Sequence, residues 1–172
     1  MRARPLAALL TGIAVLLAGC APAPAPPAAA TMRETAPPWP APRDAVSYIA
    51  AAGLPSYPLG APVGTTSTAT LQVFVGGAPV TVPGSVGIDL VRAIAAPLHT
   101  HASDGQVWVE DPKQGTYTLG EFFTLWGVRF GAGCLGDACG SLTVTIDGKP
   151  VSGDPRAVVW RPGARIRVDA RR

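Results

Sequence analysis

Two histidines in the segment LHTH are the residues whose type and spacing are best suited to chemistry. If this segment is extended, His99 and His101 project to the same face, because side chains alternate along a strand. Neutral imidazoles are suitable ligands for Cu(II), Zn(II) and Ni(II). Asp104, Glu110 and Asp111 follow closely and could add carboxylate oxygens. The pattern therefore indicates a candidate copper or zinc site.

Two histidines alone do not complete such a site, because a structural zinc has four protein ligands and a catalytic zinc about three. The alternative interpretation is that both rings form hydrogen bonds at the end of a strand and hold no ion. On this alternative the chain has no cofactor. Even with an ion, we expect affinity no tighter than about micromolar, roughly −8 kcal/mol.

The sequence contains no pattern that predicts catalysis. Ser85, Ser103 and Ser141 do not lie in a G-x-S-x-G nucleophile turn. Glu110 and Asp111 are adjacent, so on a strand their carboxylates point to opposite faces and do not share one acid–base site. A catalytic site needs a nucleophile or a metal with a positioned base. We therefore expect a non-enzymatic binding domain, with an unknown envelope protein or small ligand as its partner.

The first twenty residues have the pattern of an export signal. Arg2 and Arg4 form a basic start, and the apolar segment 6–17 is too short to span a bilayer stably. The sequence Leu-Ala-Gly-Cys at 17–20 resembles the lipobox of bacterial lipoprotein signal peptides. This resemblance implies cleavage before Cys20 and diacylation of its thiol. The alternative is an ordinary secretory signal with an incidental cysteine.

The lipobox reading predicts three parts of the chain. Residues 1–19 would be the signal peptide, and residues 20–43 the lipidated cysteine with an Ala- and Pro-rich tether. Residues 44–172 would be one folded domain outside the cytoplasm, held at the cell membrane or the outer membrane. Of the 14 Lys and Arg residues, 12 lie beyond the signal and oppose 11 acidic residues, a net charge of about +1. This charge does not indicate a nucleic-acid partner.

Cys134 and Cys139 are the two cysteines that the lipobox does not use. Outside the cytosol, such a pair is more often a disulfide than a free dithiol. A metal site is the alternative, but the chain has no second cysteine pair to complete one.

The surest predicted element is a short helix beginning after Thr118. Thr118 and Glu121 form a T-x-x-E capping box, and Gly127 is placed to end the helix in the left-handed conformation. The spacing i, i+3, i+4, i+7 predicts one buried face made of Leu119, Phe122, Phe123 and Trp126. A helix with three aromatic rings on one face is expected to pack across a sheet.

Strands are predicted on both sides of this helix. Residues 71–75 and 79–82 flank Gly-Gly as a hairpin, and 106–110 form a further strand. Residues 83–97 read as a loop with one helical turn. Alternation predicts further strands at 142–146 and 165–169. The order predicts an α+β fold, a single helix on a mixed or antiparallel sheet in a β-grasp-like arrangement, with a small β-sandwich or open barrel as the alternative.

Several segments resemble a family of uncharacterised exported bacterial proteins. They are AAGLP, LQVFVGGAPVTVPGSVGI, LHTHASDGQVWVE, TYTLGEFFTLWGVRF, CLGDAC and VTIDGKPVSGDPR, between residues 44 and 172. The resemblance implies export and one domain, and no activity. Its members tend to have histidine at the positions of Thr68, Thr70 and Trp108 of this chain, so the resemblance also implies a reduced histidine set here.

Overall fold

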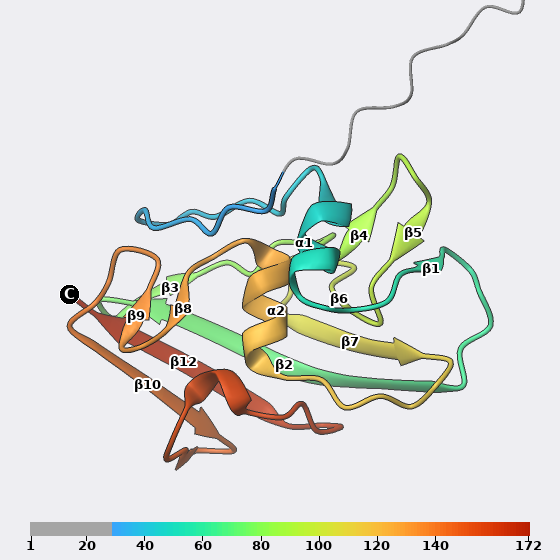
Figure 1. Ribbon diagram of the computed structural model, residues 1–172. Helices are drawn as coiled ribbons and strands as arrows, with labels where there is room; N and C mark the ends of the chain where they lie inside the picture. Colours follow the sequence, from blue (N-terminus) through green and yellow to red (C-terminus); the bar gives the residue numbers. More distant parts are fainter. Residues whose placement is uncertain (1–28) are drawn as a thin grey trace, which may run out of the picture.

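A mixed β-sheet forms the centre of the computed structural model, which describes residues 29–172 (Figure 1). Its middle strands are β2 (Thr65–Val75) and β12 (Arg165–Arg171), which pair in parallel. Beyond β12 lie β10 (Ser141–Ile146) and β11 (Lys149–Pro150). On the other side, β2 pairs with β3 (Ala78–Val80) and with β7 (Gln106–Asp111), which pairs with β6 (Leu98–His99). The long strand β2 therefore connects all parts of the sheet.

The alternation read from the sequence gives the sheet its two faces. In β12, Ile166, Val168 and Ala170 are buried, whereas Arg165 and Arg171 at its ends are exposed. The same period of two is expected wherever one face of a strand packs on a core. Arg167 lies over the Phe74 ring on the opposite face, 3.6 Å from its centroid.

The predicted α+β class is confirmed. The strand order β3-β2-β12-β10, with a parallel central pair, corresponds to the β-grasp-like arrangement, and the sheet does not close into a barrel. Residues 29–172 contain two α-helices, α1 (Ala45–Ala51) and α2 (Leu119–Trp126), of which α2 is the helix predicted to pack on the sheet. A short 3-10 helix, η1 (Pro155–Ala157), follows β11. None of the helices described between residues 29 and 172 is long and apolar enough to cross a membrane.

Helix α2 lies across one face of the sheet (Figure 1) and has the predicted ends. The Thr118 hydroxyl accepts a hydrogen bond from the Glu121 backbone NH at 3.3 Å, and the Glu121 carboxylate accepts one from the Thr118 NH at 2.6 Å. Gly127 ends the helix with φ of 69°. Phe122, Phe123 and Trp126 are fully buried, as predicted. The capping box thus fixes where this aromatic face enters the core.

Residues 33–43 belong to the folded domain, so the predicted boundary at residue 44 is too late. Arg33 forms a parallel bridge with Val128, which follows α2. Trp39 is 2% exposed and packs edge-on against Trp126, with ring centroids 5.7 Å apart. The Ala- and Pro-rich composition predicted an extended tether, but a tryptophan at this position has enough apolar surface to dock the segment onto the core. Cys20 and the signal segment lie outside the described residues.

Cys134 and Cys139 form the predicted disulfide. It closes a loop that starts in β9 (Cys134–Leu135), the partner of β8 (Phe130–Gly131). Gly136 in this loop has φ of +57°, and a Cβ there would clash with the Trp39 ring. The disulfide loop therefore forms part of the surface against which the Trp39 ring packs.

Residues 83–97 form a small sheet rather than the predicted loop with a helical turn. Strands β4 (Ile88–Asp89) and β5 (Ile94–Ala95) make a hairpin, and β1 (Tyr57–Pro58) pairs with β5. Asp89 is buried and binds the backbone and side chain of Arg92, which closes the turn between the two strands. That contact is a side-chain feature that hydrophobic periodicity does not predict.

Candidate metal centre

The two histidines lie where β6 ends. His99 is the last residue of β6 and pairs with Trp108 of β7. Between the histidines, Thr100 is fully buried, and its hydroxyl donates to the Pro83 carbonyl at 2.7 Å and accepts from the Val86 NH at 3.0 Å. These bonds fix the turn of the chain after β6, so the spacing of the two imidazoles is set by the fold.

His99 has a defined protonation pattern. Its Nδ1 lies 2.8 Å from the backbone oxygen of Ala96. A carbonyl oxygen only accepts hydrogen bonds, so Nδ1 carries the hydrogen, and Nε2 of the neutral ring is an acceptor within 3.1 Å of His101 Nε2. A histidine whose one nitrogen donates to a backbone carbonyl, leaving the other as the lone-pair nitrogen, is typical of metal ligands.

The lone-pair nitrogen of His99, Nε2, faces His101 and Glu110. The two Nε2 atoms are 3.1 Å apart, and the rings are nearly perpendicular, at 85°. Glu110 Oε2 lies 3.6 Å from His99 Nε2, and its Oε1 lies 3.9 Å from His101 Nε2. Ligand bonds of about 2.0–2.2 Å in a tetrahedral zinc site place ligand atoms roughly 3.3–3.6 Å from one another. The two nitrogens are slightly closer than this range, and the two Glu110 contacts, made by different oxygens, lie at or above its upper end.

Burial lowers the pKa of His99 below its usual value of 6.5, and the charge of His101 adds to this effect. The carbonyl of Ala96 and the carboxylate of Glu110 oppose it. The net direction favours the neutral imidazole, which is the form that binds a metal.

The three side chains line one end of a pocket of about 110 Å³. The rest of its wall is mostly apolar and comes from β1 and the segment after it, from β5 and from the residue after β7; it includes Pro58, Leu59, Val63, Ala95 and Pro112. An ion held by three protein ligands keeps an exchangeable position. Here that position would open toward the pocket.

Two of the predicted oxygen ligands are placed elsewhere. Asp104 is exposed, and its carboxylate accepts a 2.9 Å hydrogen bond from the Gln106 NH in the turn before β7. Asp111 is buried and accepts hydrogen bonds from the Tyr117 hydroxyl at 2.6 Å and the Lys113 NH at 2.8 Å. Hydrogen bonds from these groups lower its pKa, although burial alone would raise it. Of the predicted carboxylates, only Glu110 joins the histidines.

The sequence did not indicate the pocket wall, nor that the Trp108 side chain itself lies beside His101. The ring of Trp108 lies 5.3 Å from that of His101, between centroids. The segment 57–63 carries no ligand residues, so no signal connected it with a site some forty residues later. Within residues 29–172, His99, His101 and Glu110 are the only group of at least three His, Cys, Asp or Glu side chains with metal-binding spacing.

Comparison with models of protein families, with curated proteins and with solved structures finds no match to this chain. The candidate centre is therefore argued from its own geometry.

Proposed function

We propose that this chain is a lipid-anchored protein of the bacterial cell envelope that binds a transition-metal ion, Cu(II) or Zn(II), through His99, His101 and Glu110. The observation that carries the proposal is the convergence of three ligand atoms, all within 4.8 Å of one another, from the end of β6, the turn after it and the paired strand β7. The hydrogen bond from His99 Nδ1 to Ala96 supports it, because the bond directs Nε2 at the shared position.

The donor set favours these ions. Imidazole nitrogen suits zinc and copper, and one carboxylate oxygen is compatible with both. With Glu110 ionised, a bound divalent ion retains a net positive charge, and the fourth ligand would come from the pocket. Glu110 would itself be a ligand, and the described residues that line the pocket include no further histidine or carboxylate to activate a bound water. Binding, rather than catalysis, is the proposed role.

The strand register supports the location. Thr68 pairs with Trp108, and Trp108 pairs with His99, so these three positions form one row across β2, β7 and β6. Directly paired residues share a face of the sheet. In the family that the sequence resembles, histidines are expected at positions 68 and 108, which would place additional ligands in the row that contains His99.

Metal titration of the chain tests the proposal. Calorimetry with Cu(II) and Zn(II) should show one site per chain, and the double variant His99→Ala/His101→Ala should lose it. Glu110→Gln, which keeps the shape and removes the charge, should weaken binding at least tenfold. Asp104→Asn is the matched control, because Asp104 lies outside the group. Equal metal binding by the wild type and the double variant would refute the site.

Anchoring is tested separately. Cys20→Ser should abolish metabolic labelling with fatty acid and leave either an unprocessed precursor or a released protein. Labelling that persists in this variant would exclude Cys20 as the modified residue.

A further inference from the structure

The turn between β4 and β5 presents two adjacent apolar side chains to solvent. Leu90 is 70% exposed and Val91 is 92% exposed, more than any other large hydrophobic residue in the described part of the chain. Single exposed apolar residues are ordinary, whereas a contiguous pair at the tip of a hairpin suggests a contact surface.

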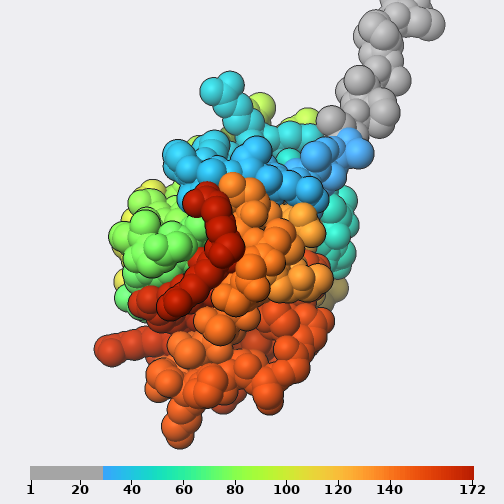
Figure 2. Space-filling model, turned by 90° about the vertical axis from the view of Figure 1, so that its left-hand side faces the viewer, coloured from blue at the N-terminus to red at the C-terminus, as the bar shows by residue number. Residues whose placement is uncertain are grey.

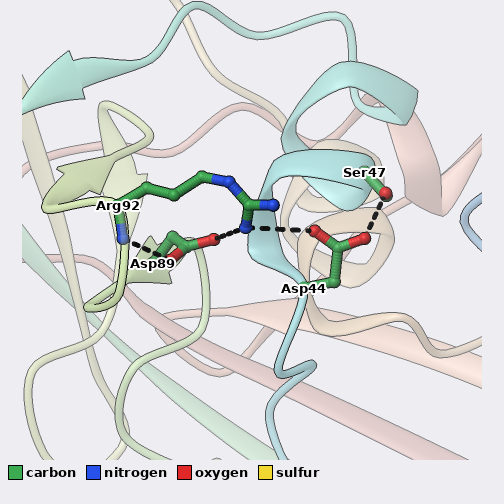
Figure 3. Close-up of polar contacts among 4 residues, drawn as sticks. All are labelled: Asp44, Ser47, Asp89 and Arg92. Carbon is green, nitrogen blue, oxygen red and sulfur yellow. Dashed lines mark hydrogen bonds and ion pairs between the residues drawn. The ribbon is translucent and has the colours of Figure 1, made fainter. Parts of the chain in front are cut away.

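The turn is held in a fixed conformation. The buried carboxylate of Asp89 accepts a hydrogen bond from the Arg92 backbone NH at 2.9 Å and another from its guanidinium at 2.9 Å (Figure 3). A buried carboxylate is unfavourable unless it is paired and hydrogen-bonded. These bonds connect the residues on either side of Leu90 and Val91. The two apolar side chains are therefore held at the surface by a turn that is already ordered.

The same arginine connects the turn to the start of α1. Its guanidinium points between Asp89 and Asp44, with Nη1 3.8 Å from Asp44 Oδ1 (Figure 3). Asp44 also accepts a 2.6 Å hydrogen bond from Ser47 in the first turn of α1. The hairpin is thus fixed beside the helix that follows the N-terminal segment.

The start of the described chain and the β4–β5 hairpin lie at the same end of the molecule (Figures 1 and 2). The eight residues between Cys20 and position 29 can span at most roughly 30 Å when fully extended. A lipid on Cys20 would therefore keep this end of the domain near the membrane surface. Arg43, next to Asp44 in the chain, is exposed and can face anionic headgroups.

We propose that Leu90 and Val91 enter the interfacial region of the bilayer that carries the lipid on Cys20. This inference rests on the anchoring part of the proposed function and is independent of the metal centre. Two side chains bind a membrane weakly by themselves, but the anchor makes their contact intramolecular and raises the effective concentration. Because β1 pairs with β5, the contact also fixes how the metal pocket is oriented over the membrane.

Fluorescence quenching by brominated lipid tests this contact. The chain from Cys20 onward is coupled through the Cys20 thiol to a maleimide phospholipid in vesicles of phosphatidylcholine and phosphatidylglycerol. This imposed anchor makes the result independent of whether the cell acylates Cys20. Val91→Trp places a reporter at the tip, and Lys149→Trp places one on the exposed β10–β11 hairpin at the opposite end.

Brominated phosphatidylcholine should quench the added emission of Val91→Trp at least twofold more than that of Lys149→Trp. Adding Leu90→Asp should remove the excess quenching, because a carboxylate resists transfer into the interface. Equal quenching at the two positions would overturn the proposal and leave a protein partner as the occupant of the tip. Failed labelling of wild-type Cys20 in cells would overturn the native anchor alone.

Discussion

The indole NH of Trp126 donates a 2.8 Å hydrogen bond to the backbone carbonyl of Trp39, which lies 87 residues earlier in the chain. The two rings also meet edge to face. This contact joins the segment before α1 to the aromatic face of α2. The fold therefore depends on residues whose composition alone suggests a spacer.

The first prediction concerns Trp39. Trp39→Ala should lower the free energy of unfolding by about 3–5 kcal/mol, because it removes a buried ring and leaves a cavity against Trp126. Urea denaturation measures the change. Glu34→Ala is the control: Glu34 is a mostly exposed partner of Arg129, and such ion pairs contribute about 0–1 kcal/mol. Equal effects of the two substitutions would show that this segment is peripheral.

The second prediction concerns the disulfide. Cys134 and Cys139 should resist alkylation in protein isolated from the envelope without reductant. Replacing both by serine should lower stability by about 1–3 kcal/mol, since a short loop constrains the unfolded chain only modestly. When the serine substitutions are combined with Trp39→Ala, the loss of stability should be smaller than the sum of the separate losses, because the disulfide loop packs against that ring. Alkylation of both thiols without reduction would contradict the pairing.

The third prediction follows from the lowered pKa of His99. Below pH 6.5 the unfolded chain takes up a proton at this histidine that the folded chain resists, so stability should fall as pH drops through this range. Denaturation at pH 7.5 and 5.5 with a chelator present measures the change. His99→Leu should remove part of this pH dependence of stability. It should not remove all of it, because His101 and Glu110, which face the ring, are still present. Stability that rises on acidification from pH 6.5 would contradict the prediction.

The fourth prediction uses the strand register. Trp108→His adds an imidazole beside His99 and close to His101, and should tighten Zn(II) binding at least tenfold. A matched change, Trp108→Phe, keeps an aromatic ring without a ligand atom and should give no gain. Competition with a chromogenic chelator compares the three proteins. Equal Zn(II) affinity of the two variants would show that a side chain at position 108 does not contact the metal.

Local signals predicted the parts of the fold that local chemistry determines. Thr118, Glu121 and Gly127 set both ends of α2, and alternation identified the faces of β10 and β12. The spacing of His99 and His101 predicted their convergence, and Glu110 was one of several carboxylates within reach. The choice among those carboxylates depends on the β6–β7 register and on the hydrogen bonds of Asp104 and Asp111. No local pattern encodes these long-range contacts.

Other features were missed for related reasons. The partner of Trp39 and the wall at 57–63 depend on which distant segments meet in the folded chain. The β4–β5 hairpin depends on the paired carboxylate of Asp89, which no hydrophobic period reveals. Local residue patterns therefore predict the helices and strands better than the contacts between them.

The parallel pairing of β2 with β12 affects when the protein can fold. These two central strands are separated by about ninety residues, and closing so long a loop is slow compared with forming local contacts. Until residues 165–171 are available, one edge of β2 and one edge of β10 lack their partner. A chain emerging from the ribosome therefore stays without its central sheet until nearly all of it is made. In the proposed export of this chain, the delay would keep the polypeptide unfolded during transport, so that the domain would form on the far side of the membrane.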